Sequence, residues 1–121
     1  MLSAYVVSKT PLYRLSENLA AETRRHGVTV FTIIPGLVRT AISESALSCG
    51  EPSIEQWFKD AFANQQDVSP ESAANLVVHI AAGAADARSG RYIHATGDLA
   101  QMIARAGEIT EDDLYVLRGR A

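Results

Sequence analysis

Residues 28–34, with the sequence Val-Thr-Val-Phe-Thr-Ile-Ile, constrain the fold of this chain more than any other segment. The run is β-branched and apolar and does not alternate strictly with polar side chains, which is typical of a strand covered on both faces. Strands of that kind occur in parallel sheets flanked by helices. Residues 91–95 form the only other convincing strand, so we expect an α/β fold with a parallel sheet.

Two strands are few for a sheet of this kind. A two-stranded parallel sheet leaves strand edges and apolar strand faces without partners. The sequence therefore predicts that the chain is not an autonomous domain, and that it needs a further segment, a second copy or a rearranged packing.

Helical patterns flank both strands. The longest predicted helix covers residues 4–26 and ends at Gly27. Pro11 lies inside it, where it removes one backbone hydrogen bond and is expected to kink the helix at a cost of about 3 kcal/mol. The alternative is a helix that begins at Pro11 with Thr10 as its cap.

Local capping signals divide the rest of the chain. Ser53 to Gln56 has the spacing of a capping box. Ser69 followed by Pro70 predicts another helix start, and Asp98 a third. The predicted elements are a helix at 4–26, a strand at 28–34, a loop and helix at 41–67 with 41–52 as the loop, a helix at 70–82, a strand at 91–95 and a C-terminal tail at 98–121.

Tyr5 and Lys9 stand four residues apart at the start of the long helix. That spacing is about one helical turn and places both side chains on one face. A phenol has a reference pKa near ~10, and an adjacent ammonium lowers it. A tyrosine in that setting can exchange a proton with a carbonyl or alcohol oxygen. The alternative is that Tyr5 only packs and Lys9 is solvated.

The order of these features resembles the short-chain dehydrogenase/reductase family over roughly residues 1–95. The matching parts are a Tyr-x-x-x-Lys that opens a long helix, a buried strand and three further motifs. These motifs are Pro35-Gly36-Leu37-Val38-Arg39-Thr40, Ser69-Pro70-Glu71 and Ser89-Gly90-Arg91-Tyr92-Ile93. The resemblance implies the C-terminal part of a Rossmann-like, doubly wound parallel sheet.

The resemblance also implies an activity, which is hydride transfer between NAD or NADP and an alcohol or carbonyl substrate. Tyr5 would be the proton donor or acceptor, and Lys9 would lower its pKa and bind the nicotinamide ribose. The other expected cofactor-binding residues are Pro35, Gly36, Val38 and Thr40. Residues 41–67 would form the substrate loop, in which Trp57 is either a lid residue or plain core.

Two features of the family pattern are absent from residues 1–121. The sequence has no Gly-x-Gly-x-x-Gly turn, and it has no room for a catalytic serine ahead of Tyr5. We therefore expect the C-terminal half of an oxidoreductase, inactive by itself, that associates with a missing N-terminal half or forms a homo-oligomer. One alternative is a truncated association module that dimerises through Leu12, Leu15 and Leu19. Another is an incomplete gene model in which Met1 is an internal methionine.

Composition limits the other possibilities. A net charge of -3 gives no reason to expect nucleic acid or a membrane surface as a partner. No apolar run approaches the ~20 residues of a membrane span, and the N-terminus lacks the pattern of a signal peptide. The single Cys49 suggests a free thiol in a reducing compartment, so we expect a cytoplasmic protein. The three histidines are scattered and predict no metal site.

Overall fold

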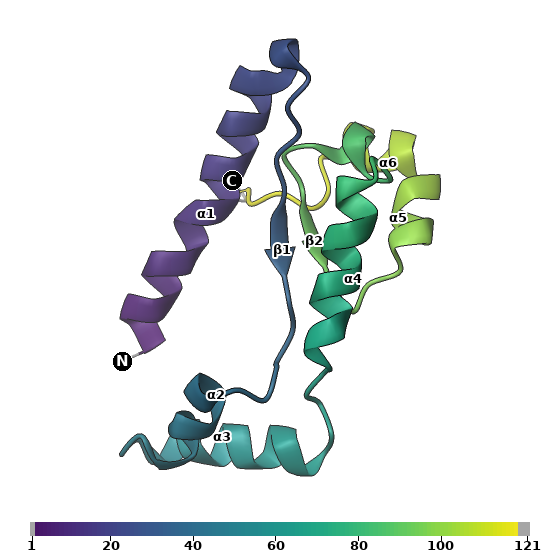
Figure 1. The fold of residues 1–121 in the computed structure, drawn as a ribbon. Coiled ribbons are helices and arrows are strands. Elements are labelled where there is room, and N and C mark those ends of the chain that lie inside the picture. Colours follow the sequence, from purple (N-terminus) through teal and green to yellow (C-terminus); the bar gives the residue numbers. More distant parts are fainter. Residues whose placement is uncertain (1, 119–121) are drawn as a thin grey trace.

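The computed structural model describes residues 2–118, which form helices around a pair of parallel strands (Figure 1). In chain order the elements are α1 (Leu2–Thr23), β1 (Thr32–Ile34), α2 (Ala41–Ser45), α3 (Pro52–Ala63), α4 (Pro70–Ala81), β2 (Tyr92–His94), α5 (Leu99–Ala104) and α6 (Ala106–Glu111). Short 3-10 turns lie at Arg24–His26, Ala46–Ser48 and Asp86–Arg88.

The two strands are parallel and covered on both faces, as the sequence predicts. Thr32 pairs with Tyr92 and Ile33 with Ile93. The Thr32 hydroxyl donates to Ser16 Oγ of α1 over 2.8 Å, so one face of the sheet lies against α1. Ile33 and Ile93 point to the other face, into the core with α4, α5 and α6. An α/β fold with a small parallel sheet follows.

The main core lies on the face of the sheet away from α1. Its buried members come from α4, β2, α5, α6 and the turn after α4, and they are Leu76, Ala85, Ile93, Met102 and Ile109. Helix α1 makes lighter contacts on the opposite face. Among them, the Tyr13 ring meets the Tyr92 ring edge-on at 5.3 Å between centroids.

Both strands are shorter than predicted. Residues 28–31 lie outside the ladder because they run beside a turn and not beside a strand. The Val30 carbonyl accepts from Gly90 N at 2.7 Å, and Val30 N donates to Ser89 Oγ at 2.9 Å. Gly90 has a φ of 90° and reverses the chain just before β2. The predicted strand at 28–34 therefore contracts to Thr32–Ile34, and the one at 91–95 to Tyr92–His94.

Helix α1 is continuous through Pro11, so the alternative start at that proline is wrong. The predicted helix at 4–26 appears as α1 followed by a 3-10 turn at Arg24–His26. Gly27 then ends the segment in the left-handed region, with a φ of 71°. No helix in the part of the chain that the structure describes is both long and apolar enough to cross a membrane.

Two of the three predicted caps are confirmed. Ser69 Oγ accepts from Glu71 N at 3.2 Å, with Pro70 in the first helical position of α4. Asp98 Oδ1 accepts from Gln101 N at 2.9 Å at the start of α5. The predicted tail contains α5, α6 and a strap that runs back across the sheet; its last residues, 119–121, lie outside the described part of the chain.

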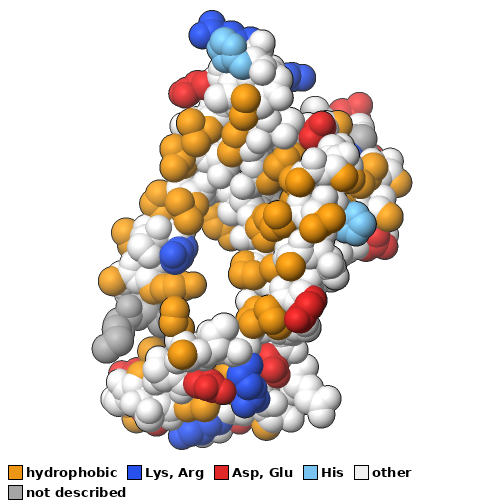
Figure 2. All heavy atoms as spheres, in the orientation of Figure 1, with side chains coloured by type: hydrophobic (Ala, Val, Ile, Leu, Met, Phe, Trp, Pro, Cys, Tyr) orange, Lys and Arg blue, Asp and Glu red, His pale blue; other side chains and the backbone are white. Residues whose placement is uncertain are grey.

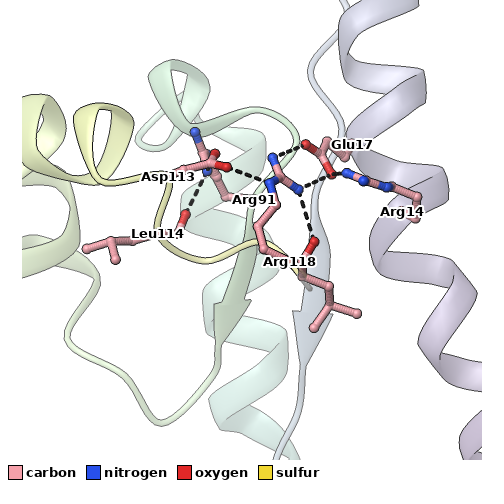
Figure 3. A network of polar contacts seen from close by, with 7 residues as sticks. Arg14, Glu17, Arg91, Asp113, Leu114 and Arg118 are labelled. Carbon is pink, nitrogen blue, oxygen red and sulfur yellow. Dashed lines mark hydrogen bonds and ion pairs between the residues drawn. The ribbon is translucent and has the colours of Figure 1, made fainter. Parts of the chain in front are cut away.

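The C-terminal strap, residues 112–118, is fixed to both β2 and α1. Tyr92 N donates to the Tyr115 carbonyl at 3.0 Å. Arg118 then binds two carboxylates, Glu17 of α1 at 2.6 Å and Asp113 at 2.5 Å (Figure 3). Arg91 also reaches Asp113, at 3.0 Å. An alternating network of arginines and carboxylates thus ties the end of the chain to its first helix.

The network makes stability depend on pH. The hydrogen bond from Arg118, helped by Arg14, lowers the pKa of Glu17 from 4.5 to about 2. A depressed carboxyl pKa contributes stability above pH 4.5 that is lost as the pH falls toward 2. Because the Glu17 side chain is a quarter exposed, we expect Glu17→Gln to cost about 1 kcal/mol at neutral pH. Urea unfolding of the full gene product at pH 7 and at about pH 3 measures the loss and its pH dependence.

Glu108→Gln is the matched control. Within the described residues, the Glu108 side chain pairs with Arg105, three positions earlier, at 2.8 Å, and it ties no distant segments together. Its replacement should change stability by less than about 0.5 kcal/mol. Equal losses for the two variants at pH 7, or an unchanged acid dependence in Glu17→Gln, would contradict a stabilising role for the strap.

Candidate functional site

The predicted proton-transfer pair lies near the N-terminal end of α1. Lys9 Nζ is 5.7 Å from the centroid of the Tyr5 ring, so helical spacing does bring the two side chains together. Tyr5 is 60% exposed, which is not the burial expected of a packing residue. The Ser8 hydroxyl bonds back to the Tyr5 carbonyl at 2.7 Å, within the helix.

This part of α1 extends beyond the main core. Every residue from 3 to 12 is exposed, whereas Tyr13, Ser16 and Ala20 further along contact the sheet and the turn before β2. Figure 2 shows an opening between the N-terminal half of α1 and the region of α2 and α3. The phenol and the ammonium are therefore accessible to a molecule in solution.

The second group of predicted residues, Pro35 to Thr40, follows the carboxyl end of β1. In parallel α/β sheets ligands bind outside this end of the strands. Val38 presents its carbonyl to the Ser43 hydroxyl, which donates over 2.8 Å. The segment is thus held in place by the first turn of α2.

Thr40 has a structural role that was not predicted from the sequence. It is the cap of α2: Thr40 Oγ1 accepts from Ser43 N at 3.4 Å, and Ser43 Oγ accepts from Thr40 N at 2.8 Å. The expected loop at 41–52 is wrong for this reason, because α2 and a 3-10 turn occupy its first part. The signal was present in the sequence as a threonine three residues before a serine.

The predicted capping box at Ser53 is also wrong. Helix α3 begins earlier, with Glu51 as cap and Pro52 in the first position, and Glu55 Oε1 accepts from Gly50 N at 2.8 Å. Pro52 has no N–H to satisfy, which favours the earlier start. Trp57 is 57% exposed and rests edge-on against its neighbour on the helix. The reading of Trp57 as plain core is therefore wrong.

Two features favour glycine at position 36: a left-handed backbone conformation and the closeness of Val68. Its φ is 85°, and a Cβ atom there would lie 3.0 Å from Val68 Cγ2. Gly36→Ala is expected to cost at least about 1–2 kcal/mol, because alanine pays the left-handed backbone penalty and meets Val68 as well. Urea unfolding measures the loss.

Gly27→Ala separates the two causes. Gly27 has a similar φ of 71°, and a Cβ atom there would meet nothing within 4 Å. We expect its cost to be smaller than that of Gly36→Ala, and the difference to shrink when Val68→Ala is added to both. Equal costs for the two glycines would contradict the close approach at Gly36.

Comparison with known proteins agrees with this architecture. The family model described as enoyl-(acyl carrier protein) reductase matches residues 1–97. The chain is 31% identical to the short chain dehydrogenase pigC of Monascus ruber over 93% of its length, and 30% identical to the galactitol 2-dehydrogenase of Rhizobium johnstonii over 76%. It is 31% identical to dehydrogenase/reductase SDR family member 4 of Bos taurus over 79%. No solved structure matches.

These relatives define a class of dehydrogenases and reductases. The chain belongs to the short-chain dehydrogenase/reductase family. It spans about a third of the length of the curated relatives it matches, 34% of the Monascus ruber protein and 35% of the Rhizobium johnstonii protein.

Proposed function

We propose that the chain forms the C-terminal part of an NAD(P)-dependent oxidoreductase that interconverts an alcohol and a carbonyl compound. The accessible Tyr5–Lys9 pair carries this proposal. The pair lies in the first turns of α1, whose N-terminal half borders the opening in Figure 2, and the segment after β1 leads from the sheet to α2. Family membership supports the general dehydrogenase or reductase chemistry, and the Rossmann-like, doubly wound sheet is part of the same proposal.

In the proposed reaction Tyr5 moves the proton. Its phenol donates a proton to the substrate oxygen when a carbonyl is reduced, and accepts one when an alcohol is oxidised. The ammonium of Lys9, 5.7 Å from the centroid of the Tyr5 ring, would hydrogen-bond a ribose hydroxyl of the cofactor. When bound, the nicotinamide cofactor supplies the hydride chemistry.

The residues after β1 suit the nicotinamide end of a dinucleotide. A hydroxyl that accepts one hydrogen bond still has a proton to donate, so the capping role of Thr40 leaves it able to bind a carboxamide. Pro35 and Gly36 turn the chain at the strand end, and Val38 offers backbone groups beside them. NAD and NADP both fit, since the ribose-reading acidic residue belongs to the glycine-rich half of such folds.

The test is an activity assay on the full gene product, including any in-frame coding sequence upstream of Met1. The absorbance of reduced nicotinamide is followed with NAD(H) and NADP(H) against a panel of alcohols, aldehydes and ketones. We expect turnover with at least one cofactor. A product that binds the cofactor but transfers no hydride to any member of the panel would count against the proposal.

A second candidate function is association. Leu12, Leu15 and Leu19 are 44%, 52% and 37% exposed on α1, which is a large apolar surface for one helix. A non-catalytic chain would use this stripe to bind a second copy. Reading the coding DNA upstream of Met1 separates the two: a glycine-rich turn and a serine in frame favour the enzyme, and a stop codon favours the module.

A further inference from the structure

Residues 40–66, which we call the excursion, form a small unit with its own buried side chains. Ser43 in α2 and Ala61 and Phe62 in α3 are buried, at 7%, 2% and 9% exposure. None of them belongs to the main core, whose members all lie in the sheet, in α4 to α6 or in the segments joining them. Figure 1 shows α2 and α3 at the end of the molecule away from α5 and α6. The excursion therefore packs mainly on itself.

The chain closes behind the excursion at a narrow neck. Val68 N donates to the Leu37 carbonyl at 2.7 Å. This bond joins the segment that leads into the excursion to the segment that returns from it. A Cβ atom at Gly36 would lie 3.0 Å from Val68 Cγ2, which is closer than an ordinary contact. Two backbone segments about thirty residues apart thus contact each other at the base of the excursion.

Arg39 fastens the excursion to that neck. Its guanidinium carbon lies 4.1 Å from the centroid of the Phe62 ring, in stacking contact with the end of α3. Its Nε is 3.6 Å from Asp67 Oδ2 on the returning segment. A guanidinium can stack on a ring and bind a carboxylate at once because it is planar and delocalised, whereas a lysine ammonium has no flat face.

We propose that Arg39 is a positioning residue that fixes the orientation of the excursion relative to the segment after β1. Through Phe62 and Asp67 it ties the end of α3 to the returning segment, across the neck from which α2 and α3 extend. The part of this inference that concerns substrate rests on the proposed function: α2 and α3 border the opening across from the N-terminal half of α1, so the orientation of the excursion would set how an alcohol or carbonyl substrate is held. The part that concerns the orientation of the excursion, which we call the mechanical part, does not depend on the proposed function.

Hydrogen exchange of the full gene product, read by mass spectrometry, tests the mechanical part. In Arg39→Ala we expect exchange to rise at least about fivefold across peptides from 41–66, the factor that follows from losing one cation–π contact. Peptides from 12–20 and 70–81 should not change. Exchange in Arg39→Lys should rise less than in Arg39→Ala, because a lysine keeps the charge and the cation–π attraction to Phe62 but loses the planar stacking. Phe62→Leu should behave like Arg39→Ala.

Lys59→Ala is the matched control. Lys59 is a half-exposed cation on α3, the helix that carries Phe62. It pairs with Glu55 of the same helix at 3.6 Å. Its loss should leave exchange across 41–66 within about twofold of the wild type. If Arg39→Ala leaves exchange in the excursion unchanged, or raises it equally in 70–81, the proposal is overturned.

Steady-state kinetics test the part that concerns substrate. Arg39→Ala should raise KM by at least about fivefold and leave kcat within about twofold, because proton transfer at Tyr5 is untouched while the substrate is held less firmly. Faster exchange together with an unchanged KM would support the positioning role of Arg39 and overturn its link to substrate binding. A wild-type product without turnover would instead count against the proposed function, and the exchange result would be unaffected.

Discussion

Tyr5→Phe is expected to lower kcat of the full gene product at least about 100-fold, the lower limit for loss of a positioned acid-base group. The change removes only the phenolic hydroxyl. Tyr5 is 60% exposed and lies outside the main core, so its ring remains and no cavity forms. The free energy of unfolding should therefore stay within about 0.5 kcal/mol of the wild type. The measurement is kcat at saturating cofactor, with urea unfolding alongside.

Tyr13→Phe provides the matched control on the same helix. Tyr13 lies about two turns further along, where its ring contacts Tyr92 over the sheet. Its hydroxyl has no part in the proposed reaction, and turnover should persist within a few-fold. Turnover in Tyr5→Phe that also persists within a few-fold would remove Tyr5 from the proton-transfer role and leave the pair as a surface feature of α1.

The 121-residue chain by itself is expected to bind neither NAD(H) nor NADP(H) with a Kd below about 1 mM. A dinucleotide is held in such folds by a glycine-rich turn at a helix N-terminus, where backbone N–H groups meet the pyrophosphate. The eight glycines of this chain are dispersed and form no such turn. Residues 35–40 would contact only the nicotinamide end. Calorimetric titration measures the affinity.

Light scattering on the same sample tests the state of the isolated chain. Within the described residues, β1 pairs with β2 alone, and the apolar side chains along α1 face solvent. These surfaces predict self-association. The full gene product serves as the positive control for dinucleotide binding. Micromolar binding by a well-folded monomer of 121 residues would show that this part of the protein contains a complete dinucleotide site.

The features that the sequence predicted correctly depend on nearby residues. Ser69 with Pro70 marks the start of α4, and Asp98 marks the start of α5, because each cap is satisfied within three residues. The parallel pairing of the two strands followed from side chains suited to burial on both faces. The approach of Lys9 to Tyr5 followed from helical spacing alone.

The errors occurred where the outcome depends on competition or on distant contacts. Two overlapping signals competed at the start of α3, and Pro52 prevailed over the capping pattern at Ser53. Strand ends depend on the partner, and the turn at Gly90 limits the ladder. The ion pair between Glu17 and Arg118 joins residues 101 positions apart, and no periodicity carries such information.

The closed neck also has an evolutionary consequence. Because residues 40–66 bury their own side chains and join the sheet at a single level, changes in their length or sequence leave the main core intact. We therefore expect residues 40–66 to tolerate substitutions and changes of length better than the strands that support them. Arg39 and Gly36 lie at the junction, so any segment that replaced residues 40–66 would have to fit against these two residues.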